Sequence, residues 1–84
     1  SYVFDGLVLL DEVSEVMGIQ FDEPEEDTIG GYVFGLIGRQ PVVGDSVESN
    51  GYKFEVLDST GFRVLRVRVI RLKKEEKEVA QHEQ

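Results

Sequence analysis

Residues 46–72, SVESNGYKFEVLDSTGFRVLRVRVIRL, alternate apolar and polar side chains along most of their length. A period of two is typical of strands that bury one face and expose the other. Asn50-Gly51 interrupts the alternation with a dipeptide that favours a tight hairpin turn, and residues 58–61 form a second group of turn residues. The stretch therefore predicts a meander of three antiparallel strands, at 46–48, 52–57 and 62–72.

Residues 1–21 predict one short strand and a first helix. Tyr2-Val3-Phe4 alternates and leads into the turn dipeptide Asp5-Gly6. Apolar residues then recur at helical spacing over residues 9–17, and Gly18 can end the helix in a left-handed conformation. We expect the first helix there, followed by a short extended piece at 19–21.

A second helix is predicted over residues 29–37. Asp27 or Thr28 can cap its free amides, and Gly38 can end it. Its apolar stripe consists of Ile29, Val33, Leu36 and Ile37. Glycines weaken a helix by up to about 1 kcal/mol each, so we expect a neighbouring backbone to approach it closely. These glycines are Gly30, Gly31 and Gly35. The element order predicts an α+β fold with both helices packed on one face of a small antiparallel sheet.

Length and composition predict one small domain, which we place at residues 1–72, with 73–84 as a polar, frayed tail. Seventeen acidic and nine basic residues give a net charge of −8, which argues against nucleic-acid binding because phosphates require clustered cations. Cysteine is absent, which excludes disulfides and thiolate metal sites. No apolar run approaches the roughly 20 residues of a transmembrane helix, so direct membrane insertion is not expected. Because Ser1 leads directly into a strand, we expect an excised piece of a longer protein.

The last predicted strand contains four arginines and no acid. Arg66 and Arg68 are expected on the outward face of the sheet, opposite a buried face formed by Leu65, Val67 and Val69. Both arginines are candidates for holding the phosphate of a nucleotide or lipid, because a guanidinium group matches phosphate oxygens. The alternative is a solvated face on which they pair with Glu55 and its neighbours. Together with Tyr52, they form a candidate interface of the aromatic and arginine composition that is enriched at protein contacts.

Residues 22–27 form an acidic loop whose five carboxylates are Asp22, Glu23, Glu25, Glu26 and Asp27. Oxygen-rich loops bind hard cations such as Mg2+ and Ca2+. The spacing lacks the EF-hand register, so the metal site predicted here is weak and hydrated. The alternative is a solvated loop whose charges favour the N-terminus of the second helix.

Catalytic groups are not predicted. The single histidine, His82, lies in the tail, so the domain cannot assemble a Ser-His-Asp or Cys-His arrangement. Asp11 and Glu15 lie one helical turn apart, but helix surfaces commonly contain such pairs without a partner base, metal or pocket. We expect no enzymatic activity.

A set of short motifs is distributed in order over residues 2–72. They are Tyr2-Val3-Phe4-Asp5-Gly6, Leu10-Asp11-Glu12-Val13, Asp27-Thr28-Ile29-Gly30-Gly31, Leu36-Ile37-Gly38-Arg39-x-Pro41-x-Val43-Gly44-Asp45-Ser46-Val47, Tyr52-x-Phe54-x-Val56 and Arg66-Val67-Arg68-Val69. As an ensemble they resemble the CorC/HlyC-type transporter-associated domain.

The resemblance implies the C-terminal cytoplasmic module of a larger, hemolysin-like membrane protein that also has a membrane domain and a pair of CBS domains. Such proteins are linked to magnesium and cobalt efflux. The implied role is regulation through contacts with those domains or with a second copy in a homodimer, at the cytoplasmic face of the cell membrane. The family fold is similar to a flavin-binding subdomain of oxidoreductases, so the alternative is a ligand-sensing module for FAD, another nucleotide or a divalent cation.

Overall fold

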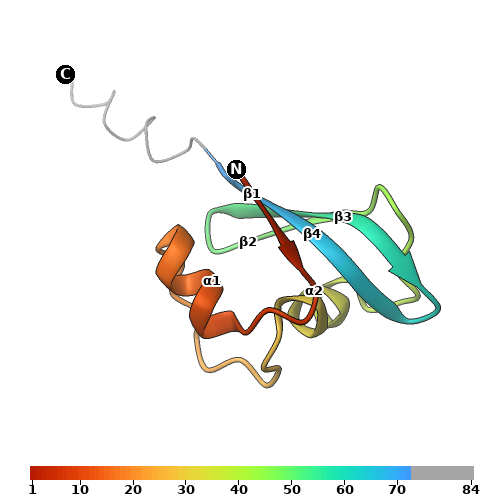
Figure 1. Ribbon diagram of the computed structural model, residues 1–84, viewed down its shortest axis with the longest axis horizontal. Helices are drawn as coiled ribbons and strands as arrows, with labels where there is room; N and C mark the ends of the chain where they lie inside the picture. Colours follow the sequence, from red (N-terminus) through yellow and green to blue (C-terminus); the bar gives the residue numbers. More distant parts are fainter. Residues whose placement is uncertain (73–84) are drawn as a thin grey trace.

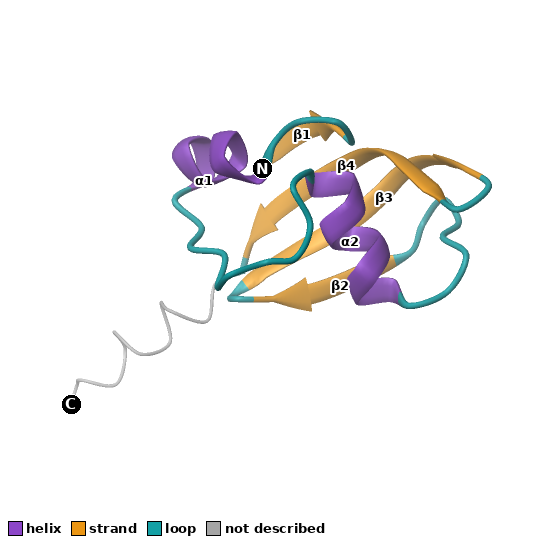
Figure 2. Ribbon diagram, turned by 90° about the horizontal axis from the view of Figure 1, so that it is seen from below, coloured by secondary structure: helices purple, strands orange, loops and turns teal. Residues whose placement is uncertain are grey.

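A computed structural model describes residues 1–72, which form a four-stranded antiparallel sheet with two helices on one side (Figure 1, Figure 2). The elements in chain order are β1 (Tyr2–Asp5), α1 (Leu10–Met17), α2 (Ile29–Ile37), β2 (Ser46–Ser49), β3 (Tyr52–Thr60) and β4 (Arg63–Arg71). The predicted α+β class and element order are confirmed. The tail predicted at 73–84 lies outside the described residues.

The strands are arranged in the order β1-β4-β3-β2. The meander supplies β2, β3 and β4 as neighbours, as predicted, and β1 pairs antiparallel with β4 so that Phe4 lies opposite Val67. The first strand therefore adds to the last one, and β3 and β4 become the central strands. Long-range pairing of this kind connects the N-terminal segment directly to the end of the domain.

The turn predicted at 58–61 is displaced, because residues 58–60 belong to β3 and the turn is formed by residues 61 and 62. The other turns and the helix ends follow the local sequence. Asn50 and Gly51 have φ values of 58° and 82°, which fit the two-residue hairpin turn between β2 and β3. Thr28 caps α2, because its side chain accepts a hydrogen bond from a first-turn amide at 3.1 Å. Both helices end at a glycine in the left-handed conformation, Gly18 and Gly38.

The core lies between the sheet and the helices. Each strand except β2 contributes buried apolar side chains, and α1 and α2 contribute the facing ones. Residues 19–21 form no strand, although Ile19 is buried. The buried apolar residues are Phe4, Leu10, Val13, Met17, Ile19, Ile29, Val33, Phe54, Val56, Val64, Val67 and Val69.

The register between β3 and β4 shifts at two places, which leaves Leu57 and Leu65 without a partner opposite. Past the shift Val64 is buried, at 6% exposure, whereas Leu65 is only half-buried. The prediction of Leu65 on the buried face is therefore wrong. Strict alternation from Val67 fails because a bulge inserts one extra residue and reverses the faces beyond it.

Gly30 is the point of closest approach between α2 and the sheet. Its amide donates to the carbonyl oxygen of Gly6 at 2.9 Å, and a Cβ atom added to Gly30 would stand 2.6 Å from the Val64 carbonyl oxygen. The expected close approach is confirmed here but not at Gly35, which has open space around it. Leu36, predicted in the buried stripe, is 40% exposed, because the buried face of α2 is centred on Gly30.

Candidate interaction surfaces

The sheet face opposite the helices, here called the outer face, contains charges of both signs. By register its side chains are Val3, Asp5, Ser46, Glu48, Lys53, Glu55, Asp58, Thr60, Arg63, Arg66, Arg68 and Ile70. Arg68 Nη1 donates to Glu55 Oε1 at 3.1 Å, and both side chains remain partly exposed. The predicted pairing of Arg68 with Glu55 is confirmed. A pair of this kind stabilises the fold by at most about 1 kcal/mol, so it leaves the face available for other contacts.

Arg66 stands between two carboxylates on the same face. Its register partners are Asp5 in β1 and Asp58 in β3. The strand that contains the arginines has no acid of its own, but the neighbouring strands place acids beside them. An anion that approaches Arg66 or Arg68 also meets these carboxylates. The arrangement is therefore better suited to a protein surface with charges of both signs than to a lone phosphate.

Tyr52 does not belong to the outer face. Its hydroxyl donates to the carbonyl oxygen of Met17 at 3.2 Å, and its ring packs against the core. Arg71 donates to the same carbonyl at 3.2 Å, with its guanidinium carbon 5.8 Å from the centroid of the Tyr52 ring. The prediction that grouped Tyr52 with the outward arginines is wrong. Residues two apart in a strand share a face, so Tyr52 lies on the helix side of the sheet together with Phe54. These contacts instead connect the end of α1 to β3 and β4.

The acidic loop does not assemble a metal site. Its side chains are exposed, and within residues 1–72 no group of three or more acidic or histidine side chains converges to hold an ion. The predicted ligands Asp22, Glu23, Glu25, Glu26 and Asp27 are thus not brought together. Consecutive carboxylates in an irregular loop repel one another and stay hydrated. The loop backbone has a structural role, because the Asp27 carbonyl accepts the Leu10 amide at 2.8 Å.

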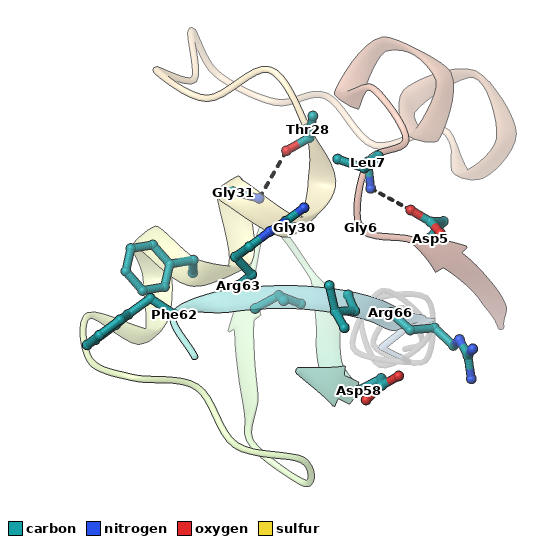
Figure 3. Close-up of a pocket in the computed structure, with 13 residues that line it drawn as sticks. Asp5, Gly6, Leu7, Thr28, Gly30, Gly31, Asp58, Phe62, Arg63 and Arg66 are labelled. Atoms are coloured by element: carbon teal, nitrogen blue, oxygen red, sulfur yellow. Dashed lines mark hydrogen bonds between the residues drawn. The ribbon is translucent and has the colours of Figure 1, made fainter. Parts of the chain in front are cut away.

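A groove that the sequence did not predict lies where β1 leaves the sheet (Figure 3). Its volume is about 490 Å3, and its lining comes from the end of β1 and the turn after it, the first turns of α2, the first residues of β4 and Asp58 of β3. Leu7, Phe34 and Phe62 supply its apolar surface. Figure 3 shows the Arg63 side chain extending from β4 toward the first turn of α2. The helix glycines were the available sequence clue, since the close approach at Gly30 brings these segments together.

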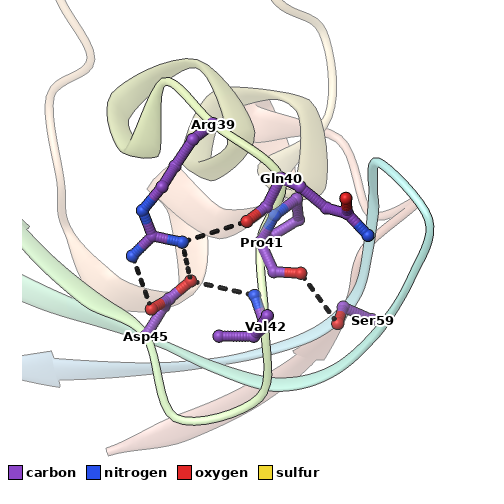
Figure 4. Close-up of polar contacts among 6 residues, drawn as sticks. All are labelled: Arg39, Gln40, Pro41, Val42, Asp45 and Ser59. Atoms are coloured by element: carbon purple, nitrogen blue, oxygen red, sulfur yellow. Dashed lines mark hydrogen bonds and ion pairs between the residues drawn. The ribbon is translucent and has the colours of Figure 1, made fainter.

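The connection between α2 and β2 is held by Arg39 and Asp45 (Figure 4). Arg39 donates from Nη2 to Oδ1 at 2.9 Å and from Nη1 to Oδ2 at 3.1 Å, and the Val42 amide donates to Oδ2 at 2.9 Å. The hydrogen bonds from Arg39, followed by the one from Val42, lower the pKa of Asp45 below its ordinary value of 3.8. The loop that they fix exposes Val42 and Val43.

Comparison with known sequences assigns the family. The CorC_HlyC family, described as a transporter associated domain, matches residues 1–73. Hemolysin C of Brachyspira hyodysenteriae is 32% identical over 76 residues, which are 89% of this chain and 28% of the relative. The polyamine export protein of Haemophilus influenzae is 35% identical over 90% of this chain and 18% of its own length. The magnesium and cobalt efflux protein CorC of Escherichia coli K12 is 33% identical over 82% of this chain and 24% of its own.

Solved structures have the same fold. A hemolysin domain from Enterococcus faecalis V583 superposes with a TM-score of 0.75 at 30% identity and covers 84% of this chain and 87% of that one. A CorC_HlyC domain from Haemophilus ducreyi gives 0.74 at 28% identity, with 83% and 86% covered. The corresponding domain of a Xylella fastidiosa hemolysin, solved in complex with Mg++ and Mn++, gives 0.72 at 28% identity, with 83% and 85% covered.

The matched region is a minor part of these curated relatives, at 18–28% of their length. Within residues 1–72, neither helix has the length and apolar character needed to cross a membrane. The sequence motifs, the family match over residues 1–73 and the shared fold all agree. The chain therefore belongs to the CorC/HlyC transporter-associated domain family.

Proposed function

We propose that this domain is a non-catalytic regulatory module of a magnesium or cobalt efflux-type membrane protein. It modulates transport by contacting the CBS pair and membrane domains of its parent protein at the cytoplasmic face of the membrane. The family match and the efflux protein among the relatives support the association with transport. The relatives have most of their length outside the matched region, which supports a module that works as part of a larger protein.

The observation that carries this proposal is the uncovered outer face. Both helices lie on the other side of the sheet, so the outer face has no covering element within residues 1–72 (Figure 1). Arg66 and Arg68 alternate there with Glu55 and Asp58. A surface with alternating charges fixes the register of a partner and disfavours wrong ones, while its net affinity stays moderate. A regulatory contact that forms and breaks needs these properties.

A chimera of E. coli CorC tests the proposal. Residues 1–73 of this chain replace the matched region of CorC in cells without their own CorC, and cobalt efflux is measured. We expect the chimera to restore efflux and a CorC without this region not to restore it. The chimera with Arg66→Glu and Arg68→Glu should accumulate in the cells to the same level but restore less cobalt efflux. Equal efflux with and without the region contradicts the regulatory role.

A second proposal is a ligand-sensing module, and two observations favour it. The Xylella fastidiosa domain was solved in complex with Mg++ and Mn++. The groove beside β4, at about 490 Å3, has a size typical of small-molecule sites and could receive FAD or another nucleotide. Calorimetric titration of the 84-residue chain with MgCl2, MnCl2, FAD and ATP separates the two functions. Saturable heat with any of these ligands supports ligand sensing. The absence of heat at millimolar ligand favours the first proposal, a module that acts through protein contacts.

A further inference from the structure

The groove at the start of β4 exists because β1 is shorter than the strand that it pairs with. The last register pair of these strands is Asp5 with Arg66, and the Gly6 amide then donates to the Leu65 carbonyl at 2.8 Å. β4, however, begins at Arg63. The chain turns away after Gly6, so the first residues of β4 extend beyond β1 and the groove opens along them.

The floor of the groove is backbone held at close range. The Gly30 amide donates to the Gly6 carbonyl, and neither glycine has room for a side chain beside the Val64 carbonyl oxygen. The Thr28 hydroxyl fixes the first turn of α2 by accepting a hydrogen bond from the Gly31 amide (Figure 3). The groove is thus already formed in the domain alone, which reduces the ordering cost of binding.

The walls of the groove are large apolar side chains that water contacts. Leu7 is 69% exposed and Phe62 is 64% exposed. Phe34 is half-buried and meets Phe62 edge-to-face, with ring centroids 6.3 Å apart. Adjacent exposed aromatic and aliphatic side chains mark contact sites, and aromatic residues with arginine dominate binding energies there.

The charged residues that line the groove are two aspartates, Asp5 and Asp58, and two arginines, Arg63 and Arg66. Among residues 1–72 the ion pairs are Arg39 with Asp45 and Arg68 with Glu55, so no carboxylate lies within pairing distance of Arg63. The Asp5 carboxylate accepts the Leu7 amide at 2.8 Å, and Asp58 faces Arg66 across the register. Arg63 is exposed and reaches toward the groove from β4 (Figure 3). A carboxylate on a partner would complement it.

We propose that this groove binds a short extended peptide segment of a partner protein that combines an apolar side chain with a neighbouring acidic one. The apolar side chain packs between Leu7, Phe34 and Phe62, and the carboxylate pairs with Arg63. This inference rests on the proposed interaction function and names a second contact surface for it. The groove shares Asp5, Asp58 and Arg66 with the outer face, so the two contact surfaces adjoin at the β1 edge of the sheet.

NMR titration of the 84-residue chain tests the site. The probe is a short capped peptide of alternating glutamate and leucine, compared with a lysine and leucine peptide and a glutamate and serine peptide. We expect saturable shifts at the amides of Leu7, Phe34, Phe62 and Arg63 with the first peptide alone. Arg63→Glu and Phe62→Ser should each weaken binding roughly tenfold or more. Lys53→Glu, the same charge reversal on the outer face, should leave binding unchanged.

Several results would overturn the proposal. They are absence of shifts at millimolar peptide, equal binding of the lysine and leucine peptide, and shifts confined to outer-face residues that do not line the groove. Self-association through Phe62 identifies a second copy as the occupant, and shifts of the groove with FMN or FAD identify a small-molecule site. If the CorC chimera fails but the peptide still binds, the regulatory function is contradicted and the groove proposal stands. The failures of the two proposals are therefore distinguishable.

Discussion

The backbone of Gly30 in α2 lies against the carbonyl oxygen of Val64 in β4, where a Cβ atom would stand only 2.6 Å away. This contact sets the distance between helix and sheet. The same contact forms the floor of the groove, since both residues line it. One helix position therefore determines both packing and a candidate binding surface.

Replacing Gly30 by alanine should destabilise the domain by roughly 1–3 kcal/mol, because the added methyl group must push a backbone oxygen away. Gly35→Ala is the matched control, since nothing lies within 4 Å of its added Cβ. That variant should gain up to about 1 kcal/mol from higher helix propensity. Urea unfolding followed by circular dichroism measures both. Equal effects at the two positions would show that the contact at Gly30 is not restrictive.

The double variant Arg66→Glu and Arg68→Glu should fold, because both side chains lie on the outer face. The acid at position 66 faces Asp5 and Asp58 and the one at position 68 faces Glu55, so each should cost roughly 0.2–1 kcal/mol. We expect a changed self-association, or changed binding to a CBS pair, in sedimentation velocity runs. The control with lysine at both positions retains the charge and should behave like the original chain. Unchanged sedimentation of the glutamate variant argues against a contact role for this face.

Thr28→Ala should destabilise the domain by about 1 kcal/mol, because it removes the acceptor of the Gly31 amide at the start of α2. Thr28→Ser retains the hydroxyl and should recover most of the loss. Thermal unfolding of the three proteins tests this cap. If serine were no better than alanine, the hydroxyl would not be the stabilising group.

The ion pair of Asp45 with Arg39 predicts a defined pH dependence. The pKa of Asp45 is lower in the folded domain than its ordinary 3.8, so the folded state favours the carboxylate. The contribution of the Asp45 carboxylate to the free energy of unfolding is fully present above the ordinary pKa. It is lost as the pH falls through the lower pKa of the folded state. Asp45→Asn should thus be less stable than the original chain from about pH 7 to about pH 5, and the difference should shrink below the ordinary pKa. Urea unfolding at several pH values measures it, and a difference independent of pH contradicts the role of the charge.

Local sequence was sufficient for most element boundaries. Thr28, Gly38 and Asn50-Gly51 each act through bonds and φ values of their own segment, and the structure places a cap, a helix end and a hairpin turn there. Alternation around Phe54 and Val67 correctly predicted the central strands. The same alternation places Tyr52, two residues before Phe54, on the buried face of the sheet. Its assignment to the face of Arg66 and Arg68 therefore conflicted with the period of two.

Tertiary structure alone decided which strands are neighbours and what the surfaces contain. The pairing of β1 with β4 places Asp5 beside Arg66, and the register shift at Leu65 buries Val64 in place of Leu65. The alternation of apolar and polar residues along one strand predicts neither. The groove arises because β1 stops short of the first residues of β4 and because α2 approaches the sheet at Gly30. The sequence by itself determined the secondary structure, the α+β class and the family, since these depend on local spacing and motif order. The composition of the surfaces depends on contacts between residues far apart in the chain, which only the folded domain brings together.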